Sequence, residues 1–216
     1  GLEREYKANL IRRSKTAAAL IFPIIFIIFI ENILIFSIAL SLICSFAIYE
    51  WITNNLKHLF FGILLIINFL ISSIFFVNIE IASNISTYII FLIIILNTSI
   101  YDSLAYLVGS RYGKIRITKR ISPNKTLEGL LGGLFFSALY GYLIYKYLEH
   151  SNLLMIIFVV SSFFAFIGDI YISYLKRKNG IKDTGSILPG HGGILDRLDS
   201  HLIATPAAII FFILVI

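Results

Sequence analysis

The residues best suited to chemistry are concentrated between Ser173 and Asp199. This run holds three cations that can bind phosphate oxygens, arginine as a planar fork and lysine as a point charge; they are Lys176, Arg177 and Lys182. A Pro-Gly-His-Gly-Gly stretch follows, in which small residues let the backbone approach a ligand and present N–H groups to an anion. The pattern predicts a site for a polyphosphate.

The same run ends in carboxylates, which predict a metal ion. Asp196 and Asp199 are three residues apart, so they share one face if a helix has begun there. Carboxylate oxygens suit magnesium, whereas the run has one histidine, His191, and no cysteine to form a zinc site. His191 itself has two interpretations, a ligand or phosphate contact and a loop histidine bonded to backbone.

A second segment, Ser-Pro-Asn-Lys-Thr-Leu-Glu-Gly, begins at Ser122. Thr126 or Ser122 can cap the helix that follows, with Glu128 in its first turn. The same helix N-terminus, with Lys125 beside it, can bind an anion. The glycines that follow favour close helix packing over ligand contact; they are Gly129, Gly132 and Gly133.

Four further carboxylates lie at one end of four different apolar runs: Glu50, Asp102, Glu128 and Asp169. An ionisable group inside a membrane segment is costly and usually marks a functional interior. Four at one depth suggest a single cavity. For Glu50 and Glu128 an ordinary helix-end position is an equally good interpretation, whereas Asp102 and Asp169 lie within their runs.

The elements that must position these residues are membrane helices. The chain has 216 residues, 58% hydrophobic and only 14% charged, with a mean hydropathy of +0.91, which is typical of an integral membrane protein. Cys44 is the single cysteine, which excludes a disulfide scaffold. Seven apolar runs predict seven transmembrane helices; they are 17–30, 33–49, 59–77, 85–108, 130–147, 153–171 and 201–216.

We therefore expect an all-α polytopic helical bundle forming one domain over 1–216, with N-terminal helices in 1–100 and catalytic helices and loops in 101–216. The net charge is +6. With seven spans, every basic residue except Lys146 falls on one side of the membrane. Basic loops stay cytoplasmic. The N-terminus and the loops at about 109–129 and 172–200 should then face the cytoplasm, in the inner membrane if the source is bacterial.

The motif from Ser173 to Asp199 resembles the C-terminal motif of the phosphatidate cytidylyltransferases, or CDP-diacylglycerol synthases, over its whole length. The Ser122 segment resembles that family's Ser-Pro-Lys-Lys-Thr-x-Glu-Gly, and Asp102 with Ala105-Tyr106 and Gly109 resembles its Asp-x-x-Ala-Tyr-x-x-Gly. Two positions differ, because Ile172 stands where the family commonly has Glu and Asn124 stands where it has Lys.

The resemblance implies the transfer of CMP from CTP to phosphatidic acid, giving CDP-diacylglycerol and pyrophosphate. It implies one or two magnesium ions, with a monovalent cation left open, and these metal ligands: Asp169, Asp183, Asp196 and Asp199. The catalytic set it implies is Ser173, Lys176, Arg177, Lys182, Asp183, Asp196 and Asp199. The substrate contacts it implies are Asp102, Ser122, Lys125, Thr126, His191, Gly192, Gly193 and Arg197. Membrane lipids and a second copy of the chain are expected partners, and nucleic acid is not.

Two other functions stay open at this point. A related CTP-dependent membrane enzyme could act on another lipid phosphate or on a polyprenol, and Ile172 in place of Glu leaves room for it. A transporter is disfavoured, because transport sites lie near the bilayer midplane while these ionisable groups gather at one face.

Overall fold

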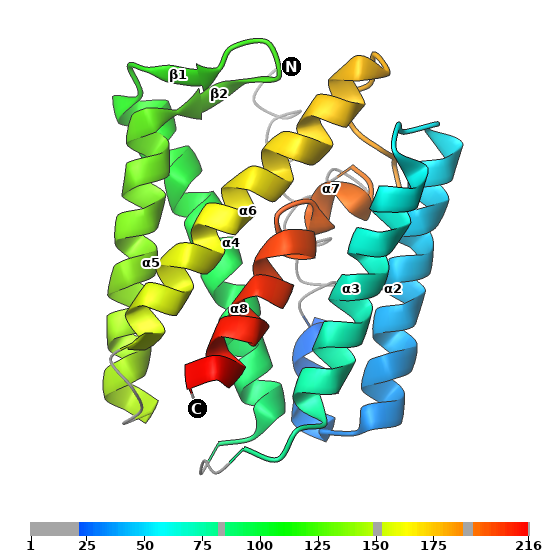
Figure 1. Ribbon diagram of the computed structural model, residues 1–216. Helices are drawn as coiled ribbons and strands as arrows, with labels where there is room; N and C mark the ends of the chain where they lie inside the picture. Colours follow the sequence, from blue (N-terminus) through cyan, green and yellow to red (C-terminus); the bar gives the residue numbers. More distant parts are fainter. Residues whose placement is uncertain (1–21, 82–84, 149–152, 188–191, 216) are drawn as a thin grey trace, which may run out of the picture.

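The computed structural model describes residues 22–81, 85–148, 153–187 and 192–215 (Figure 1). Almost all of the regular structure is helical. The elements are α2 (Ile33–Thr53), α3 (Leu59–Val77), α4 (Thr87–Tyr112), β1 (Arg116–Thr118), β2 (Ser122–Thr126), α5 (Leu127–Leu148), α6 (Leu153–Lys178), α7 (Leu195–Leu198) and α8 (His201–Val215).

Six helical segments are long and apolar enough to cross a membrane: α2 to α6, and Leu195–Val215, which joins α7 to α8. Helices satisfy all their backbone hydrogen bonds internally, which lipid requires. The prediction of an all-α polytopic membrane protein is therefore confirmed. The predicted run 17–30 lies partly outside the described residues; its part from 22 to 30 is helical and ends in a turn at Glu31. The described residues thus give six spans, and the predicted count of seven is not confirmed.

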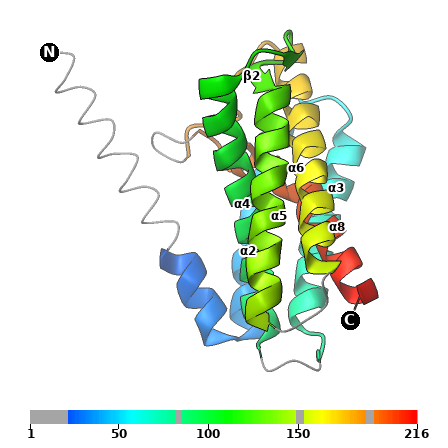
Figure 2. The same ribbon diagram turned by 90° about the vertical axis from the view of Figure 1, so that its left-hand side faces the viewer.

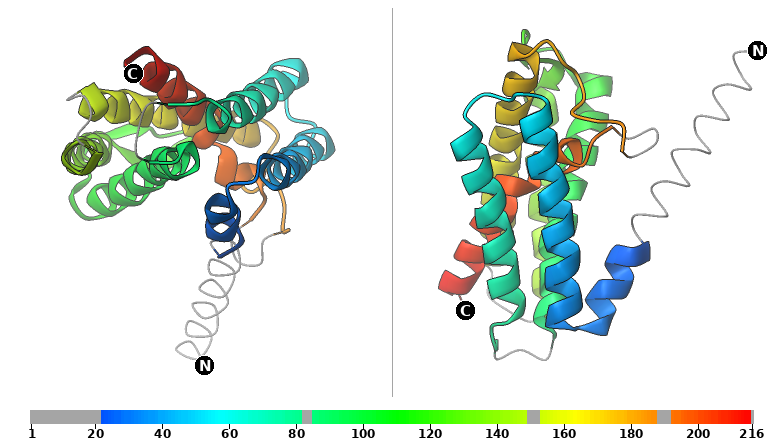
Figure 3. Two further views of the ribbon diagram at one scale, coloured as in Figure 1. Left: turned by 90° about the horizontal axis from the view of Figure 1, so that it is seen from below. Right: turned by 90° about the vertical axis from the view of Figure 1, so that its right-hand side faces the viewer.

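The helices form two groups with one helix between them. Seen from below, α2 and α3 lie on one side, α4, α5 and α6 lie on the other, and α7 and α8 run between the two (Figure 3). The packing of α2 on α3 is close at one glycine, because a Cβ at Gly62 would collide with the ring of the buried Trp51. This contact fixes the end of α2 that carries Glu50.

Small residues also bring α4 and α5 together. A Cβ at Gly129 would lie 2.6 Å from the Ala105 carbonyl oxygen, and one at Gly133 would lie 2.7 Å from the ring of Tyr101. Gly132 meets Val108 in the same way. The predicted packing role of these glycines is confirmed.

Both predicted loops contain more regular structure than expected. The segment 109–129 includes an antiparallel hairpin of β1 and β2, which lies over the ends of α4 and α5 (Figure 2). In the segment 172–200, α6 continues to Lys178 and α7 covers Leu195–Leu198, and the residues described between them, 179–187 and 192–194, form the α6–α7 loop. Ser173, Lys176 and Arg177 therefore lie on a helix. On that helix Asp169, Ser173 and Lys176 follow one another at spacings of four and three, which places them on one face.

Candidate active site

A cavity of about 360 Å³ lies beside the hairpin and reaches between the helices. Its walls come from α4, β2, α5, α6, α7 and the residues before α8. Most of its lining is polar or charged, and the polar members are Tyr101, Asp102, Tyr106, Ser122, Asn124, Lys125, Thr126, Asp169, Asp196, Arg197, Asp199 and Ser200. The apolar part of the wall includes Leu130 and Phe166.

On one side of the cavity, Lys125 of β2 forms an ion pair with Asp169 of α6. The second carboxylate oxygen of Asp169 accepts a hydrogen bond of 3.1 Å from the Ser173 hydroxyl, one helical turn further along. Lys125 also lies 5.4 Å from the centre of the Phe166 ring. β2 is held for this contact by Thr126, whose hydroxyl accepts from the backbone N–H of Gly129 at 3.1 Å and so caps α5, as predicted.

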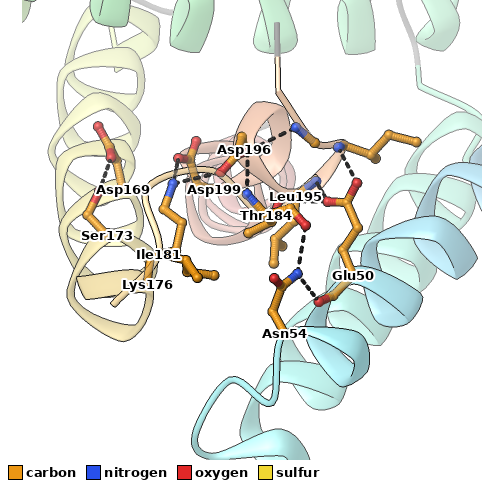
Figure 4. A network of polar contacts seen from close by, with 12 residues as sticks. Glu50, Asn54, Asp169, Ser173, Lys176, Ile181, Thr184, Leu195, Asp196 and Asp199 are labelled. Carbon is orange, nitrogen blue, oxygen red and sulfur yellow. Dashed lines mark hydrogen bonds and ion pairs between the residues drawn. The ribbon is translucent and has the colours of Figure 1, made fainter. Parts of the chain in front are cut away.

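On the other side, Lys176 reaches two aspartates. Its Nζ donates to Oδ1 of Asp196 at 2.7 Å and lies 3.9 Å from Oδ2 of Asp199 (Figure 4). The Lys176 side chain is only 8% exposed and that of Asp196 only 5%. A buried charge is tolerated when it is paired and hydrogen-bonded, so this pair is a fixed part of the site.

Asp196 is bonded to the loop before it as well. Its Oδ2 accepts from the backbone N–H groups of Thr184 at 2.8 Å and of Gly193 at 2.9 Å. Gly192, next to this contact, has a φ of 84°, which a side chain would disfavour. Of the glycines expected to meet a substrate anion, Gly193 thus donates to the carboxylate of Asp196, and Gly192 leaves no room there for a side chain.

Glu50 of α2, one of the four carboxylates expected in a single cavity, does not line the cavity, and sequence reasoning missed the contacts that it makes instead. It is 2% exposed, and its carboxylate accepts three hydrogen bonds from the α6–α7 loop and the start of α7. The donors are the Thr184 hydroxyl at 2.7 Å and the N–H groups of Ile194 and Leu195, both at 2.9 Å. The signal in the sequence was a carboxylate closing an apolar run, which a helix-end position explained equally well.

The predicted site residues fall into three groups. Those that line the cavity are Asp102, Ser122, Lys125, Thr126, Asp169, Asp196, Arg197 and Asp199. Those that bond to a lining aspartate are Ser173, Lys176 and Gly193. Of the remaining predicted residues, Lys182 and Asp183 are exposed, and Gly192 is half-buried, its Cα next to Asp196; His191 lies outside the described residues.

Arg177 has a different position from the one expected. Its guanidinium donates to the carbonyl oxygens of Ile121 at 3.2 Å and Ile181 at 2.8 Å. These bonds connect α6 to the hairpin on one side and to the α6–α7 loop on the other. Arg177 therefore connects α6 to both segments, of which the hairpin lines the cavity through β2.

The carboxylates of the cavity suit a magnesium ion that is shared with a substrate. Asp102, Asp169 and Asp199 all line the cavity, where their like charges repel one another. Within the described residues, however, no three acids, histidines or cysteines stand close enough to form a metal cage. Magnesium is usually held by one or two carboxylates together with substrate phosphates, so the hard oxygen donors present here fit that arrangement.

Comparison with known proteins relates the chain to enzymes of one kind. The sequence pattern of the Cytidylyltransferase family matches residues 53–215. The chain is 38% identical over 130 residues to the phosphatidate cytidylyltransferase of Thermotoga maritima. This match covers 56% of this chain and 48% of the relative. It is 44% identical over 108 residues to the enzyme of the same name from Staphylococcus epidermidis and 43% identical to that from Staphylococcus aureus; each match covers 49% of this chain and 42% of the relative. The matched segments thus span about half the length of these curated relatives.

Proposed function

Because this chain belongs to the cytidylyltransferase family, we propose that it transfers CMP from CTP to phosphatidic acid and releases pyrophosphate. The observation that carries the proposal is the cavity itself, in which cations and carboxylates from both sequence motifs meet at one end of a membrane bundle. A triphosphate needs cations, and a metal ion that accompanies it needs carboxylates. The named relatives, phosphatidate cytidylyltransferases, support this choice of substrates.

In this proposal, the cations of the cavity bind the phosphates of CTP and of the lipid. Lys125 and Arg197 line the wall directly, and Lys176 is within reach of the same space through its contact with Asp196. Ser122 and Ser173 can donate hydrogen bonds to phosphate oxygens. Lys125 is paired with Asp169 in the structure, so it must exchange that partner for a phosphate when a nucleotide binds.

The transfer requires no nucleophile from the protein. An oxygen of the lipid phosphate forms a bond to the α-phosphorus of CTP, and the bond from that phosphorus to the oxygen bridging to the β-phosphate breaks. The electron pair leaves with pyrophosphate, and CDP-diacylglycerol remains. Because the attacking phosphate is already ionised near neutral pH, no general base is needed, and the side chains act by positioning and by neutralising charge.

We propose magnesium as the metal of this site, held by one or two of the carboxylates of Asp169, Asp196 and Asp199 together with substrate phosphates. Bound there, it would neutralise charge on the triphosphate during transfer. The chain's own residues then fix the position of these carboxylates: Ser173 holds Asp169, and Lys176 holds Asp196.

We also propose that the cavity faces the cytoplasm. Among the described basic residues only Lys146 lies at the opposite end of the bundle, in the last turn of α5. Such an asymmetry orients membrane proteins with the basic side inward. In this orientation CTP reaches the cavity from the cytoplasm, while the acyl chains of phosphatidic acid stay in the bilayer.

The proposal is tested with purified protein in lipid nanodiscs that contain phosphatidic acid. CTP and magnesium should give CDP-diacylglycerol and one equivalent of pyrophosphate. ATP in place of CTP, diacylglycerol in place of phosphatidic acid, or EDTA in place of magnesium should each reduce product at least 100-fold. Product formed from another lipid phosphate but not from phosphatidic acid would contradict the assignment of the acceptor.

A further inference from the structure

The α6–α7 loop, of which residues 179–187 and 192–194 are described, is attached to the end of α2 through several polar side chains. Besides the three bonds to the Glu50 carboxylate, the Asn54 amide donates to the Thr184 carbonyl oxygen at 2.6 Å and to the Glu50 carbonyl oxygen at 2.7 Å (Figure 4). In return, the Asn179 amide donates to the carbonyl oxygens of Asn54 and Asn55 at 2.9 and 2.7 Å. The two segments are 124 or more residues apart in the sequence.

Two glycines let the loop pack closely against Glu50 of α2. A Cβ at Gly193 would collide with the Thr184 hydroxyl and with the Glu50 carboxylate, and one at Gly185 would lie 2.8 Å from Oε1 of Glu50. Glycine at these two positions lets the loop close around the carboxylate. Burying a carboxylate is costly unless hydrogen bonds replace its water, and here the replacements come from the loop and the first residues of α7.

The bonds made to Glu50 and to Asp196 come from the same or adjacent residues of the loop. Thr184 donates through its hydroxyl to Glu50 and through its backbone N–H to Asp196. Gly193 donates its N–H to Asp196, and the next residue, Ile194, donates its N–H to Glu50. Asp196 in turn holds Lys176. A chain of direct contacts therefore leads from α2 to a cation of the cavity.

We propose that Glu50 is a positioning residue for the transfer reaction, which acts by fixing the loop whose N–H groups hold Asp196 against Lys176. Glu50 does not line the cavity, and it precedes the segment 53–215 that matches the family. The proposal rests on the proposed function for its kinetic part. Its structural part, that Glu50 orders the bonds made to Asp196, stands independently of the reaction.

The first test is Glu50→Gln. The amide keeps the size of the side chain, but its NH₂ group faces N–H and O–H donors and cannot accept from them. We expect kcat to fall about 10- to 100-fold, as for a misplacement of reacting groups by about 1 Å, while KM for CTP stays within threefold. The matched control is Phe36→Leu, a buried substitution on the same helix, which should lower the melting temperature and leave kcat within twofold.

The second test uses Thr184, in case Glu50→Gln fails to fold. Thr184→Ser retains the hydroxyl donor and should keep kcat within twofold, whereas Thr184→Val removes it at constant shape and should lower kcat at least fivefold. Addition of Thr184→Val to Glu50→Gln should reduce kcat less than the product of the single effects, since both act on one bond. Equal kcat for the Ser and Val variants would overturn the proposal.

The third test reads the loop directly by hydrogen exchange at single-residue resolution. In Glu50→Gln the amides of Thr184 and Gly193, which donate to Asp196 and not to Glu50, should exchange at least tenfold faster, and in Phe36→Leu they should not. Unchanged exchange would overturn the structural part. Faster exchange with unchanged kcat would overturn the positioning role. If the wild type does not transfer CMP at all, the proposed function fails, and the exchange result still decides whether Glu50 orders the loop.

Discussion

Lys125 and Lys176 reach the aspartates of the cavity from two different elements, β2 and α6. Each is paired in the structure with a carboxylate that we assign to the metal. Since carboxylates in a poorly solvated cavity repel one another, these lysines stabilise the site when no nucleotide is bound. When a triphosphate binds with its metal, the two lysines would exchange their carboxylate partners for phosphate oxygens, and the carboxylates would bind the metal.

Replacement of Asp199 by Asn should nearly abolish transfer. Asp199 lines the cavity together with Asp169 and Asp102. Its replacement removes a carboxylate charge that we assign to the metal, so we expect kcat to fall about 100-fold or more, as on loss of a preorganised charged group. Asp183→Asn is the matched comparison, because Asp183 is exposed and was assigned to the metal from the family resemblance. Steady-state assays should show an effect at least tenfold smaller for Asp183. An equal loss would mean that Asp183 joins the site when substrate binds.

Replacement of Lys125 by Gln should weaken CTP binding. The variant loses a cation that lines the cavity, and a charge-assisted hydrogen bond contributes about 1.5 to 3 kcal/mol, so KM for CTP should rise at least tenfold. Lys119→Gln removes the same charge from an exposed position of the hairpin and should change KM less than twofold. If both variants raised KM equally, the effect would come from the net positive charge of the hairpin and not from a direct contact between Lys125 and CTP.

At the scale of elements, the contact between α4 and α5 sets the width of the cavity. Gly133→Val would press on the Tyr101 ring, 2.7 Å from the position of a new Cβ, and Tyr101 is itself part of the cavity wall. Overpacking of this kind costs about 1 to 3 kcal/mol. We expect a lower melting temperature in detergent together with a lower kcat. Leu131→Val, at a residue of α5 that is 57% exposed, should affect neither.

Sequence reasoning located the spans and both motifs, because apolar runs and motif residues are local features. It missed the hairpin, although Ile115-Arg116-Ile117-Thr118 alternates apolar and polar residues as strands do. It ended the helix before Ser173, because a run of charged residues after an apolar stretch is typical of a loop, whereas α6 continues through that run to Lys178. The role of Glu50 depends on a contact across more than 130 residues, and no pattern within α2 could reveal it.

At the scale of the whole molecule, the bundle collects its charge at one end. The hairpin lies there above the ends of α4 and α5, and the C-terminal end of α6 lies at the same end of the bundle, nearer α2 and α3 (Figure 1). The opposite end carries Lys146 as its described basic residue. One asymmetry of charge thus accounts for both the orientation that we propose and the placement of the site.

Cysteine labelling tests this orientation. In a Cys44→Ala background, Lys119→Cys on the hairpin and Glu80→Cys at the other end are both exposed positions. A membrane-impermeant maleimide added to intact cells whose outer membrane is permeabilised should label the cysteine at 80 and not the one at 119. Inverted vesicles should give the reverse pattern. Labelling at 119 from outside would contradict a cytoplasmic site.

The central claim, that the cavity transfers a cytidylyl group, is tested most directly by following two labels of CTP. With phosphatidic acid, magnesium and the wild-type protein, label from the α-phosphate should appear in the lipid and label from the γ-phosphate in pyrophosphate, and Asp199→Asn should abolish both. Transfer of the γ-phosphate to a lipid would show a kinase, and CTP left intact by folded protein would show no transfer; either result would contradict the account.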